Sequence, residues 1–226
     1  MSIRPRRSAR LTPRLAFDLS LYLVIGPDAT AGRDVTSIAL AAVRGGATMV
    51  QLRYKVGASE IMQSAREVIE VLRPTGVPVI INDRIELARA LGAQGVHLGQ
   101  GDASPVEARN VLGEDAIVGL SITAPEQVAA IDPSIVDYLG VGPIFATGSK
   151  PDAAPPLGLE ALTQIAASVR LPVVAIGGIT EANAAAVIRA GADGLAVISA
   201  ICAADSPEDA ARELVTRIDE ARSGAR

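Results

Sequence analysis

The sequence predicts an α/β fold, a single-domain (β/α)8 barrel (TIM barrel), in which eight parallel strands alternate with helices. Short apolar runs rich in β-branched residues alternate with longer segments that have apolar residues at helical spacing. Eight such strand–helix units occur within 226 residues, and eight units close a barrel of this kind. The strand segments are apolar on both faces, as in a buried parallel sheet. A doubly wound open sheet is the alternative that the same pattern allows.

The expected strands are short apolar runs rich in β-branched residues. They cover residues 20–25, 48–53, 77–82, 95–98, 116–121, 136–142, 172–177 and 194–199. Helix starts follow Asp83, Ser104, Thr123 and Ser206, each a potential N-cap with an acid three residues further on. We therefore expect one catalytic domain over residues 19–226, preceded by a basic, disordered tail at residues 1–18.

Composition excludes several classes of function. The net charge of -4 and the aromatic content of 2% argue against a nucleic-acid binder. The apolar runs are too short and too often interrupted to cross a membrane. Cys202 is the only cysteine, so no intrachain disulfide can form. The arginine-rich start lacks the long apolar run of a signal peptide, and an anionic partner for it is an alternative to a solvated tail. We expect a cytoplasmic protein.

In such barrels the reactive groups lie where the strands end. Gln51, Arg53 and Lys55 alternate along the end of the second strand and so share one face. An amide and two cations suit a phosphate or diphosphate. Lys55 and Lys150 are the only lysines of the chain, and both fall at expected strand ends. This placement weakens the alternative that they form ordinary surface ion pairs.

The third and fourth strands are followed by acidic residues. Asp83 follows Asn82, and Asp102 follows the strand at residues 95–98. Two carboxylates from adjacent loops fit Mg2+, which fills its remaining positions with water and substrate phosphate. Asp83 could instead cap the next helix, with Glu86 completing a capping box. Asp102 has no evident structural role, because Ser104 is available as the cap of its helix.

The fourth and fifth strands add an imidazole and a hydroxyl. His97, the only histidine, is expected to be a hydrogen-bonded structural residue, with a ligand contact as the alternative. Ser121 ends the fifth strand and can donate to a phosphate or to a substrate ring nitrogen. Thr123 is expected to cap the next helix.

Paired glycines end the seventh strand at Gly177 and Gly178, and the eighth ends at Ile198 and Ser199. Glycine lets backbone N–H groups approach an anion, and barrels often bind phosphate in these two loops. Together with the metal and the cations near strands two to five, this predicts two anion sites. A protein that binds a metal diphosphate and a monophosphate is suited to be a transferase.

Six ordered motifs resemble the thiamine-phosphate synthase family. They are QLRYK (51–55), INDR (81–84), GVHLGQGD (95–102), GPIFATGSKPDAAPPLGLE (142–160), VAIGGI (174–179) and GADGLAVISAI (191–201). The resemblance covers about Leu21 to Ile201. It implies a Mg2+-dependent barrel enzyme that joins hydroxymethylpyrimidine diphosphate to hydroxyethylthiazole phosphate, giving thiamine phosphate and diphosphate.

The resemblance also implies roles for particular residues. The diphosphate would contact Arg53, Lys55, Asn82 and Lys150. Asp83 and Asp102 would bind Mg2+, and Gln51 and Ser121 would contact the pyrimidine. The thiazole phosphate would contact Thr147, Ser149, Gly178, Ile198 and Ser199. Arg53, Lys55, Lys150 and Ser121 are thereby the candidate catalytic residues. The segment that carries Lys150 looks like a linker, yet strands continue on both sides, so we interpret it as a loop able to act as a lid.

Three positions depart from the family pattern. Tyr54 stands where Glu is usual, and strand alternation places it on the face opposite Arg53. Ser149 replaces a common Thr and keeps the hydroxyl. Thr123 stands where a histidine is usual, which could alter the pyrimidine contacts.

Other functions compete with the synthase. The nearest is a thiazole tautomerase of a sister branch, which uses a histidine where Thr123 stands and lacks the acid at Asp102. An isomerase of tryptophan biosynthesis would explain the glycine-rich ends but not the lysines. A non-catalytic sensor of thiamine phosphates is the third alternative. A homodimer is one option that the sequence leaves open.

Overall fold

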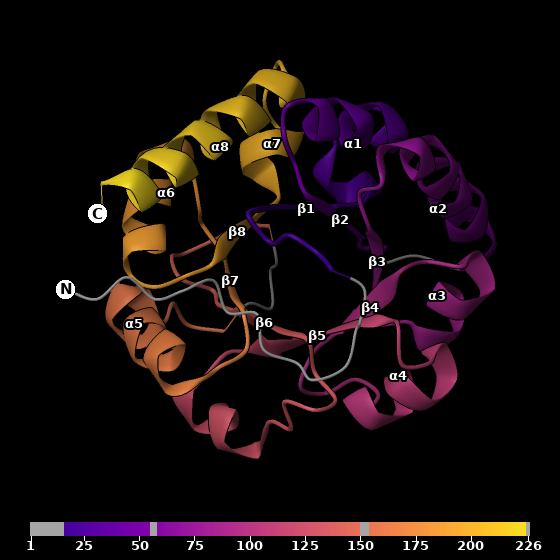
Figure 1. Cartoon of the computed structure of the whole chain (residues 1–226). Coiled ribbons are helices and arrows are strands. Elements are labelled where there is room, and N and C mark those ends of the chain that lie inside the picture. The colour runs from indigo at the N-terminus through magenta and orange to yellow at the C-terminus, as the bar shows by residue number, and fades with distance from the viewer. Residues whose placement is uncertain (1–15, 55–57, 150–153, 225–226) are drawn as a thin grey trace.

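The computed structural model describes residues 16–54, 58–149 and 154–224, and it shows a closed ring of eight parallel strands with helices outside it (Figure 1). The strands are β1 Leu21–Ile25, β2 Met49–Leu52, β3 Val79–Asn82, β4 Gly95–Leu98, β5 Ile117–Ile122, β6 Tyr138–Val141, β7 Val173–Ile176 and β8 Gly194–Val197. In an open sheet β1 and β8 would be edges. Here they pair in parallel, with Leu21 opposite Leu195. The predicted (β/α)8 barrel is confirmed, and the open sheet is excluded.

Helices connect successive strands around the outside of the ring (Figure 1). The α-helices are α1 Val35–Arg44, α2 Ala58–Leu72, α3 Ile85–Leu91, α4 Pro105–Leu112, α5 Gly158–Ser168, α6 Glu181–Arg189, α7 Ser199–Cys202 and α8 Pro207–Ser223. Three 3-10 helices are η1 Pro27–Ala29, η2 Arg73–Thr75 and η3 Pro125–Ala130.

Two of the four expected N-caps are confirmed. The Ser104 hydroxyl accepts from the Glu107 N–H at 3.1 Å, and the Ser206 hydroxyl accepts from the Asp209 N–H at 3.3 Å. Each cap is followed by a proline in the first helical turn, where the missing N–H breaks no helical hydrogen bond. These caps show why α4 and α8 begin where they do.

The other two expected caps are wrong. Thr123 does not cap a helix, because η3 begins later and the Gln127 side chain folds back to accept from the Thr123 N–H at 2.8 Å. Asp83 does not cap α3 either, because its backbone is left-handed, with φ of 61°, and the residue at the start of α3 is Arg84. The Asp83 carboxylate therefore makes no capping hydrogen bond to α3.

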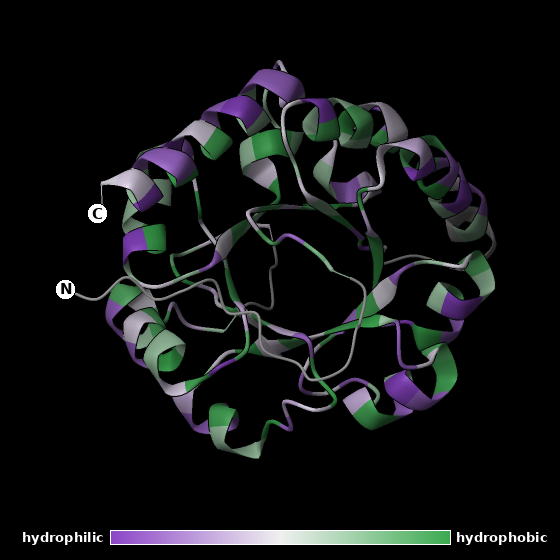
Figure 2. Cartoon of the chain, in the orientation of Figure 1, coloured by the Kyte–Doolittle hydropathy of each residue, from purple (hydrophilic) through white to green (hydrophobic). Residues whose placement is uncertain are grey.

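Side chains alternate between two apolar layers along each strand. Tyr22 and Val24 of β1 face the inside of the ring, where they pack with Met49, Ile80 and Tyr138. Their neighbours on β1 face the helices in a second, larger cluster. Figure 2 shows hydrophobic residues on the ring of strands and hydrophilic residues on the outer faces of the helices. Among the described residues, no helix is long and apolar enough to span a membrane.

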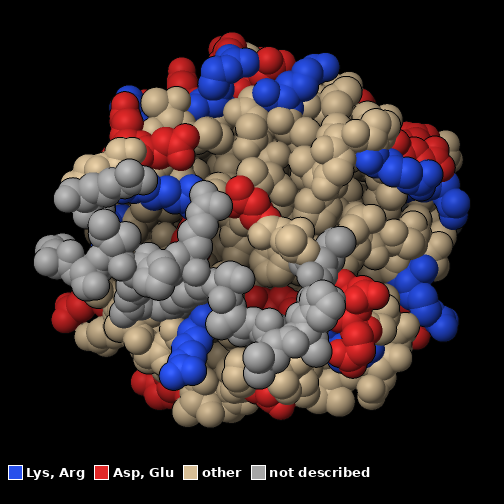
Figure 3. Space-filling view, viewed as in Figure 1, with Lys and Arg blue, Asp and Glu red and all other residues tan. Residues whose placement is uncertain are grey.

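The periphery of the molecule carries both signs of charge. On the face shown in Figure 3, basic and acidic side chains are interspersed around the outer rim. Arg212 of α8, for example, forms an ion pair with Glu208 at 2.8 Å. Such exposed pairs contribute little stability.

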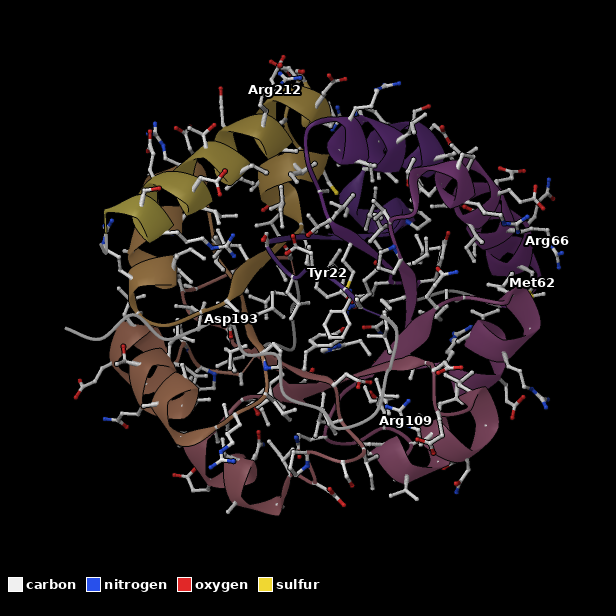
Figure 4. The ribbon with its side chains drawn as sticks, viewed as in Figure 1. Tyr22, Met62, Arg66, Arg109, Asp193 and Arg212 are labelled. Atoms are coloured by element: carbon white, nitrogen blue, oxygen red, sulfur yellow. The ribbon has the colours of Figure 1, made fainter. Side chains whose placement is uncertain are left out.

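A buried ion pair joins α4 to the segment before β6. Arg109, labelled in Figure 4, contacts the Asp137 carboxylate at 2.7 Å, and both side chains are almost fully buried. The Arg109 guanidinium also donates to the carbonyls of Ala116 and Ile135. Asp137 in turn accepts from the N–H of Val118. One guanidinium thus ties together a helix and the starts of two neighbouring strands.

We expect Arg109→Met to lower the free energy of unfolding by about 3 kcal/mol, because it leaves the Asp137 carboxylate buried without its cation. Urea denaturation followed by circular dichroism measures the change. The matched control is Arg89→Met, which removes an exposed pair with Glu86 and should change stability by less than about 0.5 kcal/mol. Equal effects in the two variants would show that burial of the pair does not matter.

Cys202 is buried in α7, and burial raises the pKa of its thiol to about 12. Because only the thiolate reacts readily, we expect the native protein not to react with a thiol-specific disulfide reagent at about pH 8, and the urea-unfolded protein to react with one equivalent. Absorbance of the released thiol checks this. Rapid labelling of the folded protein would contradict it.

Candidate active site

A cavity of about 340 Å³ opens at the carboxyl ends of the strands, and every strand or the loop after it contributes to its wall. Nine of the residues predicted from the sequence line it: Gln51, Arg53, Asn82, Ser121, Thr147, Ser149, Gly178, Ile198 and Ser199. Lys55 and Lys150 lie outside the described residues, as does the middle of the loop interpreted as a lid. Asp83 and Asp102 do not line the cavity; they follow the lining residues Asn82 and Gly99.

At the end of β2, successive side chains alternate between the inside and the outside of the ring, as predicted. Gln51 is buried in the ring, where its amide nitrogen donates to the Tyr22 hydroxyl at 2.8 Å. Arg53 also lines the cavity. Tyr54 faces the other way, and its hydroxyl lies 3.1 Å from that of Ser64 on α2. The prediction that Tyr54 lies opposite Arg53 is confirmed. Among the lining residues described, Arg53 is the only one with a permanent positive charge.

Asp83 and Asp102 interact at the ends of β3 and β4. Burial, together with the hydrogen bond and negative charge of Asp102, raises the pKa of Asp83 to about 6, while the Arg53 charge opposes this shift. The Asp102 carboxylate also accepts from the Gly99 N–H at 2.6 Å. The expectation that Asp102 has no structural role is therefore wrong, because this bond closes its own loop.

This acidic pair fits Mg2+. A cation bound by two neighbouring carboxylates offsets their mutual repulsion. The described residues hold no cluster of three or more His, Cys, Asp or Glu side chains suited to a metal. Two carboxylates are nevertheless enough for Mg2+, which takes its other ligands from water and substrate phosphate. Asp83 and Asp102 are thus able to hold the ion at the edge of the cavity.

His97 is held by hydrogen bonds at both ring nitrogens. Its Nδ1 lies 2.9 Å from the Tyr138 hydroxyl and its Nε2 lies 3.0 Å from the Ser121 hydroxyl. Burial lowers the pKa of His97 to about 4, although the Asp102 charge opposes this. The imidazole is therefore neutral at neutral pH. The prediction of a hydrogen-bonded structural histidine is confirmed, and the same ring also lines the cavity.

The loops after β6 and β7 pack directly on each other. Gly177 and Gly178 both have positive φ, 98° and 64°. A Cβ at Gly178 would lie 2.6 Å from the Ala146 carbonyl oxygen. The Thr147 hydroxyl accepts from the Ser149 N–H at 3.2 Å within the neighbouring loop. Glycine at residue 178 is therefore needed for its backbone angle and for the close approach of the two loops.

The sequence predictions missed three polar residues near the cavity. Tyr22 lines it from β1, Tyr138 holds His97 from β6, and Gln100 donates to the Ser121 carbonyl at 2.7 Å. One sequence signal could have indicated the two tyrosines. The chain has only three, and two of them occur in predicted strands of the ring. Pattern alone does not reveal that their hydroxyls meet.

We expect Gly178→Ala to destabilise the protein more than Gly76→Ala, by at least about 1 kcal/mol, because it adds overpacking to the cost of a left-handed backbone. Gly76 is the matched control, with φ of 73° and nothing within 4 Å of a built Cβ. Urea midpoints of the two purified variants measure the difference. Equal midpoints would mean that the loop after β6 moves aside freely.

A family model, curated sequences and a solved structure that resemble this chain all point to one family. A sequence model of the family described as thiamine monophosphate synthase matches residues 21–201. A thiamine-phosphate synthase of Azorhizobium caulinodans is 48% identical over 207 residues, covering 91% of this chain and 98% of the relative. One from Xanthobacter autotrophicus is 51% identical over 207 residues, with the same coverage of both chains. A solved structure of thiamine phosphate pyrophosphorylase from Pyrococcus furiosus superposes with a TM-score of 0.80 at 32% identity, covering 90% of this chain and 96% of that one.

Proposed function

Because this chain belongs to the thiamine-phosphate synthase family, we propose that its barrel cavity is where hydroxymethylpyrimidine diphosphate and hydroxyethylthiazole phosphate are joined. As a transferase of this family it forms thiamine phosphate. The observation that carries the assignment of the site is that residues from separate strands, expected at two different anion sites, line one cavity. A common cavity is what a reaction between two phosphorylated substrates requires.

The chemistry needs little covalent help from the protein. The diphosphate leaves from a benzylic-type carbon of an electron-rich aminopyrimidine, a carbon that can ionise. The thiazole nitrogen then attacks that carbon and forms the new C–N bond. The chain's tasks are to neutralise the departing charge and to align the thiazole nitrogen.

The Ser121–His97 pair does not make this site a hydrolase of the Ser–His–Asp type. The group on His97 Nδ1 is the Tyr138 hydroxyl, where such a triad places a carboxylate. The lowered pKa of His97, caused by burial, also makes the imidazole a weak base. The pair supports Ser121 as a hydrogen-bonding residue for the pyrimidine.

The diphosphate would lie at the ends of β2 to β4. Arg53 and Asn82 line the cavity there, and Lys55 and Lys150 would add positive charge, a role that rests on the sequence. Asp83 and Asp102 would hold Mg2+. When bound, the ion neutralises negative charge on the diphosphate. Arg53 performs the same task from the cavity wall.

The thiazole phosphate would lie at the loops after β6, β7 and β8. The hydroxyls of Thr147 and Ser149 and the backbone of Gly178 line this part of the cavity, and Ile198 and Ser199 line it from the end of β8. These groups are uncharged donors, and a monophosphate that stays attached throughout the reaction needs only to be held. Charged side chains lie at the ends of β2 to β4, and the loops after β6 to β8 present uncharged groups. This difference supports placing the departing diphosphate at the ends of β2 to β4.

The tautomerase alternative receives no support. Asp102, the acid that the tautomerase branch is expected to lack, is present. The curated relatives above carry the name thiamine-phosphate synthase. The cytoplasmic location and the homodimer stay predictions.

The test of this function is incubation of the purified protein with both substrates and Mg2+, followed by detection of thiamine phosphate and diphosphate. We expect Asp102→Ala and Lys150→Ala each to lower turnover by at least about tenfold, because Asp102→Ala removes a ligand of the Mg2+ and Lys150→Ala removes a positive charge, and both cations would stabilise the departing diphosphate. Circular dichroism should show both variants folded.

The control variant is Asp115→Ala, an exposed carboxylate before β5 and so at the opposite end of the barrel. It should retain the rate of the unaltered protein. Unaltered rates in both site variants would refute the assigned site. Binding of both substrates without product would favour the sensor.

A further inference from the structure

A chain of hydrogen bonds runs through the interior of the barrel to the cavity. Gln51 contacts the Tyr22 hydroxyl at 2.8 Å, and Tyr22 contacts the Tyr138 hydroxyl at 2.9 Å. His97 then links Tyr138 to Ser121 through its two ring nitrogens, at 2.9 Å and 3.0 Å. Figure 4 shows the Tyr22 side chain inside the ring of strands. Five side chains from five strands thus form one connected series.

The chemistry of the groups gives this series a direction. The Gln51 amide nitrogen can only donate, so the Tyr22 oxygen accepts from it. Each phenol has a single hydrogen, and either hydroxyl can donate in the bond between Tyr22 and Tyr138. Donation from Tyr22 to Tyr138 is the arrangement in which both phenol hydrogens have an acceptor within the series. Tyr138 in turn gives its hydrogen to His97 Nδ1.

A neutral imidazole that accepts at Nδ1 carries its hydrogen on Nε2. That hydrogen is donated to the Ser121 oxygen. The Ser121 hydrogen is then left to point elsewhere, and among the described side chains it has no acceptor. Since Ser121 lines the cavity, its hydrogen is available to a bound ligand.

We propose that Tyr138, supported by Tyr22, is a positioning residue that holds His97 in its Nε2–H tautomer, so that Ser121 offers the cavity a hydrogen-bond donor. The ligand group that matches it is an acceptor, such as a ring nitrogen of the aminopyrimidine. This last step rests on the proposed function, whereas the tautomer of His97 does not.

Close packing fixes the geometry of the series. A Cβ at Gly119 would lie 2.2 Å from Tyr138 Cζ and 2.5 Å from His97 Nδ1. A Cβ at Gly140 would lie 2.7 Å from His97 Cε1. The two glycines therefore make room for the bond between Tyr138 and His97. Phe17 packs edge-on against the Tyr138 ring, with the ring centres 5.9 Å apart.

The opposite direction is the clear competitor. If the Gln51 amide were turned so that its oxygen faced Tyr22, every hydrogen bond in the series would reverse. His97 would then carry its hydrogen on Nδ1, and the Ser121 hydroxyl would donate to the imidazole. Ser121 would offer the ligand only an acceptor. The two directions therefore predict opposite tautomers of His97.

Nuclear magnetic resonance can read this tautomer directly. His97 is the only histidine of the chain, so untagged protein labelled with ¹⁵N-histidine gives one pair of ring-nitrogen signals. We expect the ligand-free full-length protein to show a protonated-type signal for Nε2 and an unprotonated-type signal for Nδ1. A protonated Nδ1 would overturn the proposal.

Tyr138→Phe tests the positioning role. Removal of the hydroxyl takes away the donor at Nδ1, and we expect the His97 signals to shift to a mixture of both tautomers. The matched control is Tyr54→Phe, in the remaining tyrosine, whose hydroxyl bonds Ser64 and should leave the signals unchanged. Unchanged signals in Tyr138→Phe would overturn the role of Tyr138.

Tyr22→Phe provides a second variant in case Tyr138→Phe does not fold. It frees the Tyr138 hydroxyl to accept from the imidazole, so a mixture of tautomers is again expected. Signals that stay wholly of the Nε2–H type in this variant would contradict the series.

Kinetics complete the test. We expect Tyr138→Phe to lower kcat/KM for the pyrimidine diphosphate by roughly tenfold, the typical effect of one lost hydrogen bond to a substrate, and to leave KM for the thiazole phosphate unchanged. Equal losses toward both substrates would indicate a merely structural role. Absence of product from the unaltered protein, with the Nε2–H tautomer observed, would refute the proposed function and leave the assignment of the series intact.

Discussion

Closure of the strand ring is the constraint on which the other features depend. The pairing of β1 with β8 leaves no sheet edge, and it brings all eight carboxyl ends to one rim. Residues as far apart in the chain as Gln51 and Ser199 then line one cavity. Without closure, the loops after β6 to β8 would not face the acids and the arginine near β2 to β4.

A second constraint is that polar groups inside the ring must be paired. An unpaired buried hydroxyl or imidazole destabilises a fold. The interior therefore holds its polar side chains as one series, with Tyr22, Tyr138 and His97 each bonded on two sides. The series ends at Ser121 in the cavity wall, so pairing the buried groups also determines how that wall binds hydrogen-bonding ligands.

Charge is distributed unevenly around the cavity. Asp83, Asp102 and Arg53 interact on one side, where the shifted pKa of Asp83 reflects its burial and its neighbour Asp102. The side formed by the loops after β6 and β7 presents hydroxyls and glycine backbone. A departing diphosphate develops charge, and the attached phosphate of the other substrate does not. Under the proposed function, this difference would account for ions on one side of the cavity and uncharged donors on the other.

The sequence by itself determined the barrel and its strand order, because strand alternation depends on local spacing, and its motifs indicated nine of the lining residues. The confirmed caps at Ser104 and Ser206 also depend only on nearby residues, because each hydrogen bond joins residues three apart in the chain. The wrong caps at Asp83 and Thr123 were decided by left-handed backbone and by the Gln127 side chain. Only the tertiary structure decided that Tyr22, Tyr138 and His97 meet, because their strands lie far apart in the chain and hydrogen bonds form only where closure of the ring places the atoms within about 3 Å.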